Sequence, residues 1–397
     1  MDKRSAVNPT YLTAKSTLLM LAGAGSDDAK RMIGALDTRD DLTRNRDKLD
    51  DGSSPLSEAD GKAIMVGVTL SVEARYAAVS RLIRTEGCTN LLDVACGYTP
   101  RAIFCEREGV DYVGLDVPVV AEELNRAAPG LGIGHAHPVY VGSDATNAAS
   151  LAAAADLLDG ELLISCEGLF PYLSEDEASQ LIAGVRETLL QHGGAWVTSD
   201  MGVNYESFAT AAMSSPDAAE LYHKARRKTV GSPDIFNEGV SFADEAYKRA
   251  LFERGGLMVE RLPFHHGDED LAMLRQVPEA WREAFVRLLE GCSVWRMTVD
   301  ESSVAETVIE GAKQVDNLEV RYALAGDTLA CEVSGRIDTI SAPALLEAFE
   351  EHFDQVTRIE VDATSLTYIS SAGLRVLMMA SKRLGMGPSR FCTLPLP

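Results

Sequence analysis

The chain has 397 residues, of which 46% are hydrophobic, so it is long enough for two domains of ordinary globular composition. Its formal net charge of −23 at pH 7 argues against nonspecific binding to nucleic acid or to an anionic membrane. The seven cysteines include no Cys-x-x-Cys pair, so no zinc site is predicted, and we interpret them as reduced thiols of a cytoplasmic protein.

The N-terminal part, residues 1–85, is predicted to be helical. Apolar residues recur at helical spacing around Leu18 and again around Ile64, with a charged, loop-like stretch at residues 37–55 between them. The apolar run at residues 17–25 is too short to span a membrane, and no signal-type cleavage site follows it. The last predicted helix of this part carries Arg75 and leads to the first strand.

Seven strands are predicted in the next part, most of them separated by helical stretches. They cover residues 90–94, 111–115, 138–142, 161–166, 195–200, 257–264 and 292–299. This alternation predicts an α/β domain over residues 1–300, with a doubly wound, mostly parallel sheet of the Rossmann-like kind and an antiparallel pair at its edge. The insertion at residues 201–256 is predicted to lie over the carboxyl ends of the strands as a substrate lid.

The turn after the first strand has the pattern of a cofactor site. The apolar run with Asp93 is followed by Gly97 and a helix start, and nineteen residues after Gly97 the second strand ends at Asp116. An acid at that position holds the ribose of an adenosine in open α/β sheets. The three-glycine fingerprint for a pyrophosphate is absent, and Pro100 offers no N–H to a phosphate. The pattern therefore predicts an adenosine cofactor without phosphates, which S-adenosylmethionine fits.

Further candidate residues stand at later strand ends. Asp144 and Ala145 follow the third strand, and Glu167 follows the fourth, where active-site residues gather in such sheets. Each candidate has a structural alternative. Asp144 can cap the helix that starts at residue 148, Asp93 can orient the turn, and Arg75 can be a surface residue. No general base and no metal cluster stand out, so the catalytic residues stay open.

Together these motifs resemble class I S-adenosylmethionine-dependent methyltransferases and, more narrowly, the leucine carboxyl methyltransferase-like O-methyltransferases, over roughly residues 8–300. The Gly-x-x-x-Arg turn at 97–101 and the Glu-Gly-x-x-x-Tyr-Leu run at 167–173 carry the narrower match. The resemblance implies these roles: Arg75 meets the methionine carboxylate, Gly97 allows close approach, Asp116 takes the ribose hydroxyls, and Asp144 with Ala145 reads the adenine.

The implied activity is O-methyl transfer to a small-molecule hydroxyl or to a carboxylate. A carboxylate is ionised at pH 7 and needs no base, whereas a hydroxyl does. The acceptor therefore stays open. The alternative is a non-catalytic regulator whose first domain only senses the cofactor.

The pattern changes after residue 300. Residues 301–317 are predicted to be a linker helix, and residues 318–397 a small α/β module. Residues 333–338, 359–362 and 368–375 resemble the STAS domain of anti-sigma factor antagonists. This resemblance implies an anti-sigma factor or a serine kinase as partner and a phosphorylated serine at Ser371, with a plain helix cap at Ser370 or Ser371 as the alternative. Residues 387–397 show no helical or strand period, so the module is predicted to be incomplete.

Overall fold

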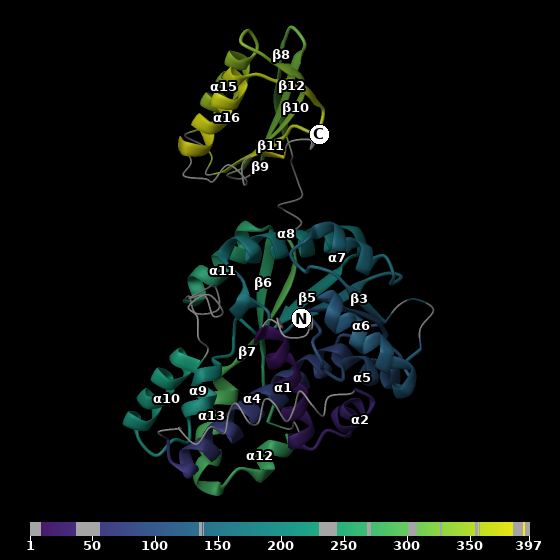
Figure 1. Cartoon of the computed structure of the whole chain (residues 1–397), viewed down its shortest axis with the longest axis vertical. Coiled ribbons are helices and arrows are strands. Elements are labelled where there is room, and N and C mark those ends of the chain that lie inside the picture. Colours follow the sequence, from purple (N-terminus) through teal and green to yellow (C-terminus); the bar gives the residue numbers. More distant parts are fainter. Residues whose placement is uncertain are drawn as a thin grey trace, which may run out of the picture. The chain divides into compact units, whose positions relative to one another are not determined.

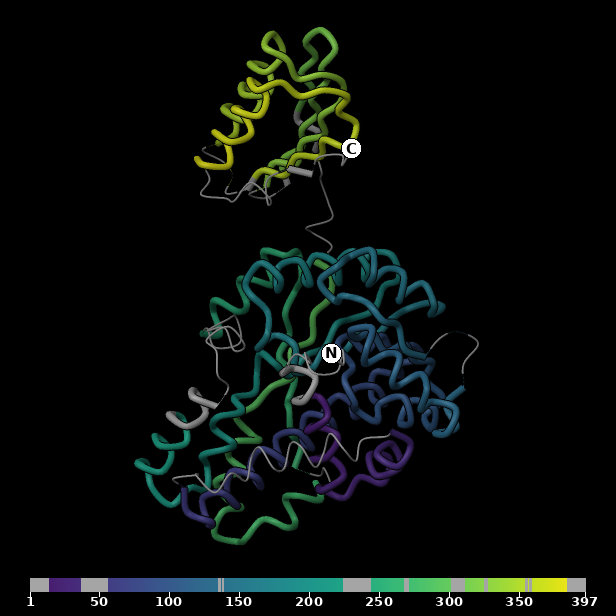
Figure 2. Tube along the Cα trace, in the orientation of Figure 1, coloured from purple at the N-terminus to yellow at the C-terminus, as the bar shows by residue number. Residues whose placement is uncertain are grey.

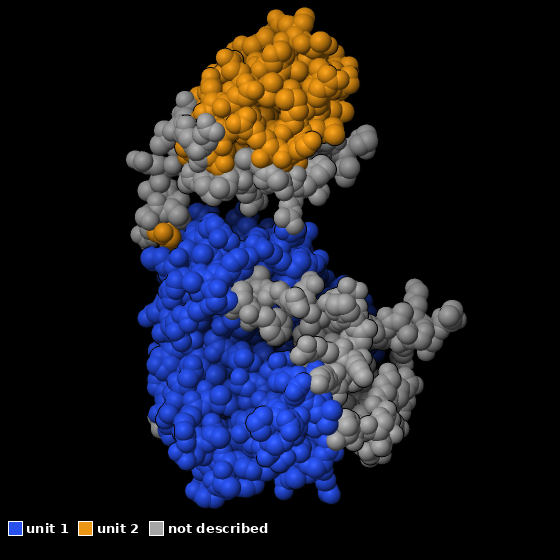
Figure 3. Space-filling model, turned by 90° about the vertical axis from the view of Figure 1, so that its left-hand side faces the viewer, with its two compact units in different colours: residues 1–299 blue, residues 300–397 orange. Residues whose placement is uncertain are grey.

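The computed structural model describes residues 9–36, 56–134, 137, 139–229, 244–267, 271–300, 308–325, 328–353, 356, 358–383 and 392–393. The chain divides into two compact units, residues 1–299 and 300–397, which Figure 3 colours separately. The first unit contains a seven-stranded sheet and the second a six-stranded sheet.

The sheet of the first unit has the strand order β3-β2-β1-β4-β5-β7-β6. Its strands are β1 (Asn90–Val94), β2 (Asp111–Asp116), β3 (Tyr140–Gly142), β4 (Leu162–Cys166), β5 (Gly194–Thr198), β6 (Leu257–Pro263) and β7 (Ser293–Val299). Neighbouring strands from β3 to β5 pair in parallel, whereas β7 pairs antiparallel with both β5 and β6. The predicted α/β sheet with an antiparallel edge pair is confirmed.

Helices cover both faces of this sheet. They are α1 (Pro9–Ala24), α2 (Asp27–Ala35), α4 (Glu58–Thr85), α5 (Arg101–Glu108), α6 (Pro118–Ala127), α7 (Ala148–Ala155), α8 (Glu175–His192), α9 (Tyr205–Thr210), α10 (Pro216–Thr229), α11 (Glu245–Arg254), α12 (Ala272–Gln276) and α13 (Glu279–Gly291), with short 3-10 turns η2 (Ala128–Leu131) and η3 (Phe170–Tyr172). Figure 1 shows α7, α8 and α11 on one side of the sheet and α1, α4 and α5 on the other.

The central strands are buried on both faces. Leu91 packs in a hydrophobic cluster with residues of α1, α4 and α5, whereas Leu92 packs in a second cluster with residues of α7, α8 and α11. Successive side chains of a strand point to opposite faces, so a strand covered on both sides reads as a continuous apolar run. Polar side chains of these strands are therefore concentrated where the strands end.

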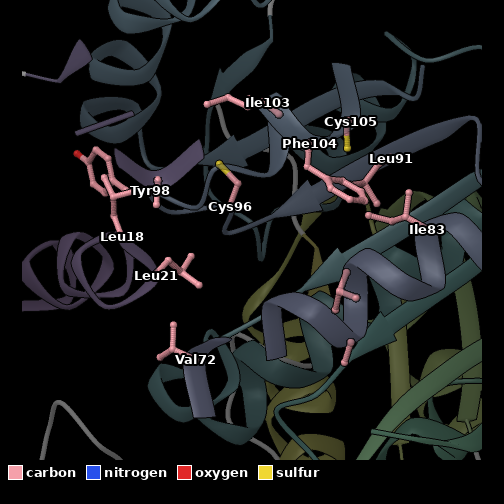
Figure 4. Packing of buried hydrophobic residues seen from close by; sticks show 14 of the residues in the cluster. Leu18, Leu21, Val72, Ile83, Leu91, Cys96, Tyr98, Ile103, Phe104 and Cys105 are labelled. Carbon is pink, nitrogen blue, oxygen red and sulfur yellow. The ribbon is translucent and has the colours of Figure 1, made fainter. Parts of the chain in front are cut away.

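Helix α1 covers the turn that follows β1. Figure 4 shows Leu18 and Leu21 of α1 on the same side of this turn as Val72 of α4, close to Cys96 and Tyr98. All five side chains belong to one buried cluster. The N-terminal helices are therefore part of the core around this turn.

Helix α4 is, within the described ranges, the single helix long and apolar enough to cross a membrane by length and composition. Of its most apolar window, 56% is buried inside the fold. Since the core helix of a globular unit passes the same test, this property is weak evidence for a membrane span.

The insertion between β5 and β6 is joined to the core more firmly than a detachable lid. Helix α9 lies against α4 (Figure 2), and a Cβ atom on Gly67 of α4 would lie 1.9 Å from the carbonyl oxygen of Phe208. The side chains of Phe208 in α9 and Phe252 in α11 are fully buried. The insertion thus supplies side chains to the hydrophobic core. The prediction of a substrate lid did not include this structural role.

In the described residues of the second unit, the helices α15 and α16 pack against a sheet whose order is β13-β11-β10-β9-β8 with β12 beside β10. Its elements are β8 (Val308–Val315), β9 (Leu318–Ala325), β10 (Thr328–Ile337), α15 (Ala342–Glu350), β11 (Arg358–Asp362), β12 (Leu366–Ile369), α16 (Ser371–Arg383) and β13 (Cys392–Thr393). One buried cluster, which includes Leu329, Leu345 and Ile359, forms its core.

Two predictions for this part of the chain are wrong. The predicted linker helix at residues 301–317 contains strand β8, which pairs antiparallel with β9. The sequence of β8, VIEGAKQV, does not alternate apolar and polar residues, so it shows no strand pattern. Its Lys313 forms ion pairs with Glu347 at 3.0 Å and Glu351 at 2.8 Å. The tail predicted to lack structure contains β13, which pairs in parallel with β11. A strand of two residues is defined by its backbone pairing and is too short to show an alternation of apolar and polar side chains.

Candidate functional site

A cavity of about 1360 Å³ lies at the carboxyl ends of the strands in the first unit. The described residues that line it come from α1, α4, the turn after β1, the ends of β2 and β4, and the insertion after β5. Of the predicted site residues, the lining includes Arg75, Gly97, Asp116, Asp144, Ala145 and Glu167. Small-ligand sites typically measure about 300–1000 Å³, so this cavity has room for two ligands.

Asp116 connects the end of β2 with the turn after β1. Its Oδ2 accepts a hydrogen bond from the backbone N–H of Gly97 at 2.8 Å, and its Oδ1 accepts one from Val117 at 2.7 Å. Gly97 has a φ of +55°, in the left-handed region that favours glycine. Burial raises the pKa of Asp116, and the two backbone N–H groups counteract this rise. Each carboxylate oxygen keeps a second lone pair, so Asp116 can still accept two hydroxyl protons.

Asp93 lies behind the wall of the cavity. Its carboxylate accepts hydrogen bonds from the hydroxyls of Ser165 at 2.5 Å and Tyr112 at 3.1 Å, and the residue is only 4% exposed. Burial raises its pKa, and the charge of Arg101 opposes this rise. The side chain joins β1 to both neighbouring strands through these two contacts, and its role toward the turn or the cofactor stays a prediction.

Asp144 and Ala145 lie in the loop between β3 and α7, on the cavity wall. The Oδ1 atom of Asp144 accepts hydrogen bonds from the backbone N–H of Thr146 at 2.9 Å and from its hydroxyl at 2.8 Å. The helix cap is Asn147, whose side chain accepts from the N–H of Ser150. The alternative role of Asp144 as cap of this helix is therefore wrong, and its exposed carboxylate faces a space that a ligand can enter.

Glu167 belongs to a buried chain of four alternating charges. Arg101 Nη2 lies 2.6 Å from Glu167 Oε2, and Arg75 Nε lies 3.8 Å from Glu167 Oε1. Arg75 Nη2 lies 3.1 Å from Asp200 Oδ1. Burial raises the pKa of Glu167, while Arg101 and Arg75 lower it. The four charges cancel, and these contacts leave Nη1 of Arg75 able to bind a ligand carboxylate.

Asp200 is the functional candidate that the sequence analysis missed. Its buried carboxylate accepts the backbone N–H groups of Gly168 at 2.7 Å, Leu169 at 2.9 Å and Phe170 at 3.1 Å, besides the guanidinium of Arg75. It thus holds the loop after β4 and orients Arg75. The available signal was its place as the last residue of the predicted fifth strand, residues 195–200, the same kind of position that identified Asp116.

The insertion after β5 supplies the opposite wall of the cavity. The ring of Tyr205 lies 4.8 Å from Arg75 Cζ, and its hydroxyl lies 3.4 Å from Asp200 Oδ1. Tyr222 of α10 and Lys248 of α11 also line this side. The insertion therefore forms part of the cavity wall. That it acts as a substrate lid stays a prediction.

In the second unit, Ser370 and Ser371 have different positions. The Oγ atom of Ser370 accepts a hydrogen bond from the backbone N–H of Gly373 at 3.4 Å, as a helix cap does. Ser371 is the first residue of α16 and is exposed. Its hydroxyl is therefore accessible at a helix N-terminus, where added negative charge is tolerated.

Comparisons with known proteins identify the second unit. A family model described as "Mlab, STAS domain" matches residues 320–389, so this part of the chain contains a STAS domain. An anti-sigma factor antagonist from Mycobacterium paratuberculosis is a similar solved structure, with 22% identity, 20% of this chain and 68% of that chain covered, and a TM-score of 0.17. No curated protein sequence matches the chain.

Solved structures similar to the first unit include two methyltransferases. Magnesium protoporphyrin IX methyltransferase from Synechocystis PCC 6803, with bound SAH, is 13% identical over 66% of this chain and 94% of that chain, with a TM-score of 0.37. Mitomycin 7-O-methyltransferase is 13% identical over 75% of this chain and 76% of that chain, with a TM-score of 0.36.

Proposed function

We propose that the first unit binds S-adenosylmethionine and transfers its methyl group to an oxygen acceptor, either a small-molecule hydroxyl or a carboxylate, as the leucine carboxyl methyltransferase-like enzymes do. The observation that carries this proposal is the contact between Gly97 and the carboxylate of Asp116 on the wall of a cavity with room for two ligands. A second-strand acid next to a glycine turn is suited to a ribose.

The other cavity residues fit the remaining parts of this cofactor. Asp144 and Ala145 lie on the wall beyond Asp116, where an adenine would follow the ribose. In the buried charge chain, Nη1 of Arg75 can bind the carboxylate of the amino acid group and Glu167 its ammonium. When bound, the sulfonium supplies an activated methyl group. The protein then has to hold the acceptor oxygen in line and exclude water.

Replacing Asp116 by alanine is expected to weaken cofactor binding. We expect micromolar binding of S-adenosylhomocysteine to the full chain, roughly −8 kcal/mol. Loss of the ribose acceptor should reduce this by about 1–3 kcal/mol. Isothermal titration calorimetry measures both values.

Asp111→Ala is the matched control, because Asp111 stands at the opposite end of the same strand. It should leave the affinity unchanged. Equal affinities of the D116A and D111A variants would contradict the role of Asp116. Tight binding of NAD without binding of S-adenosylhomocysteine would contradict the cofactor assignment.

We further propose that the STAS domain binds an anti-sigma factor or a serine kinase through the surface around Ser371, as a regulatory module. A specific observation favours this second role. On α16, Ser371 is followed by Leu374 and Met378, whose side chains are 43% and 68% exposed. Exposed large apolar side chains on one helix are typical of a protein-binding surface.

Replacing Ser371 by aspartate is expected to weaken partner binding, because it places a negative charge beside this apolar surface, as a phosphate would. The full chain should recover a partner in a pull-down, and the S371D variant should recover much less of it. Ser371→Ala, which adds no charge, is the control and should retain the partner. A partner retained by all three proteins, or a changed S-adenosylhomocysteine affinity in S371D, would contradict the expectation.

A further inference from the structure

The side of the cavity formed by the insertion holds a cation without an acidic partner. Lys248 of α11 is half-buried on the cavity wall, and its Nζ donates a hydrogen bond to the carbonyl oxygen of Met201 at 3.2 Å. No carboxylate of the described part of the chain lies within salt-bridge distance of this Nζ. Its surroundings therefore differ from those of the other cavity cations.

The described lining contains two other cations, and both are already paired. Arg75 forms its ion pair with Asp200, and Arg261 contacts Glu245 at 2.9 Å. No histidine is among the described lining residues. Lys248 is thus the cation of the described lining that has no protein carboxylate within ion-pair distance, whereas Nη1 of Arg75 is assigned to the carboxylate of the cofactor in the proposed function.

The environment of Lys248 favours such an anion. Partial burial lowers the pKa of Lys248, and the more distant charges of Glu245, Asp200 and Asp244 oppose this decrease. A partly buried cation whose hydrogen bond goes to a neutral carbonyl keeps part of its desolvation cost. A ligand oxyanion at Nζ would supply the missing partner, so binding of an anion is favoured at this point of the cavity.

The chemistry of the site selects among anions. An arginine fork matches the two oxygens of a carboxylate, whereas the ammonium of a lysine acts as a single point charge. A lysine also pairs with carboxylates, as Lys313 does with Glu347 and Glu351, but it offers a carboxylate no second parallel contact, so a ligand with one charged oxygen loses nothing at Lys248. The rings of Tyr172, Tyr205 and Tyr222 line the same cavity and suit an aromatic body.

We infer that the methyl acceptor is a phenol, and that Lys248 binds its ionised oxygen. This inference rests on the proposed methyl transfer and narrows its acceptor to one chemical class. Lys248 is assigned here as an acceptor-binding residue that stays protonated.

The step balances without a protein base. A phenol has an ordinary pKa of about 10, and a neighbouring ammonium stabilises the phenolate, so its proton leaves to solvent at lower pH. The phenolate oxygen then bonds to the methyl carbon while the carbon–sulfur bond breaks. The electron pair of that bond stays on sulfur, which becomes a neutral thioether.

The probe for this site is 4-nitrophenol, whose ionisation is visible in its absorbance. It is titrated with pH in the presence of the full chain, once with S-adenosylhomocysteine and once without it. Bound to the wild type, the probe should ionise at lower pH than in free solution. Lys248→Met should abolish this shift and weaken phenolate binding roughly tenfold or more. Lys248→Arg, which keeps a positive charge, should retain most of the shift.

Four outcomes would overturn the inference. They are an unshifted probe, no bound probe in either titration, a K248M variant that behaves as the wild type, and 4-nitrobenzoate that binds as tightly as the phenolate with the same dependence on Lys248. A circular dichroism melt checks that both variants fold. Failure of S-adenosylhomocysteine to bind would contradict the proposed function instead, and the titration without it still tests Lys248.

Discussion

Replacing Arg101 by methionine is expected to lower the free energy of unfolding of the first unit by about 3–5 kcal/mol. The Arg101 side chain is only 1% exposed, and it bonds Glu167 at 2.6 Å and the hydroxyl of Ser80 at 2.6 Å. Its guanidinium also lies 4.1 Å from the ring centre of Tyr76. Without Arg101, the buried carboxylate of Glu167 keeps only the more distant Arg75. Urea denaturation followed by tryptophan fluorescence measures the loss, because all three tryptophans lie in the first unit.

Two controls distinguish the cost of leaving a buried carboxylate unpaired from the cost of losing an ion pair as such. Arg287→Met removes an exposed pair with Glu283 on α13 and should cost only about 0.2–0.5 kcal/mol. The double variant R101M/E167L removes both charges and should recover much of the loss.

The loss of unfolding free energy in the R101M variant (its stability deficit) should also depend on pH. Burial already raises the pKa of Glu167, and removal of Arg101 removes the largest influence that lowers it. A raised pKa in the folded state gives stability that is lost as pH rises through that pKa. The deficit should therefore be small in acid, where Glu167 is protonated, and should grow as Glu167 ionises. A deficit that is independent of pH would contradict this account.

Much of the first unit could be predicted because its determinants are local. Strand β1 is buried at all five positions, and its apolar Leu91, Leu92 and Val94 are typical of a strand covered on both faces. Ser174 with Glu177 forms the capping box that begins α8. Asp116 could be placed in the site from its position alone, because the ends of neighbouring parallel strands meet at one edge of a sheet.

The features that were missed depend on contacts between distant parts of the chain. Asp200 meets Arg75 across 125 residues of sequence, and neither residue has a local pattern that indicates the pair. The Gly-x-x-x-Arg turn includes Arg101, but the complete burial of this arginine follows from its contacts with Tyr76 and Glu167. Strand β8 was missed because its residues do not alternate between apolar and polar, whereas backbone pairing with β9 defines the strand.

Replacing Gly67 by alanine is expected to destabilise the first unit by about 3 kcal/mol, at the upper end of the range for overpacking. The added Cβ would lie 1.9 Å from the carbonyl oxygen of Phe208 and 3.2 Å from a ring carbon of Phe285. The first of these atoms belongs to the backbone of α9, so the helix has to move away from α4 to relieve the contact. Because α9 also carries Tyr205 to the cavity beside Arg75, the same movement should weaken binding of S-adenosylhomocysteine.

A chemically identical change on the same helix provides the control. Gly61 also lies in α4, but a Cβ atom added there meets nothing within 4 Å. Gly61→Ala should therefore raise the free energy of unfolding by about 0.5–1 kcal/mol, through the better helix propensity of alanine. Helix propensity alone would make both variants more stable, so only the contact between α4 and α9 predicts opposite signs. If G67A proves as stable as G61A in urea denaturation, the insertion is not held against α4 at Gly67, and the wall that it gives the cavity is free to open.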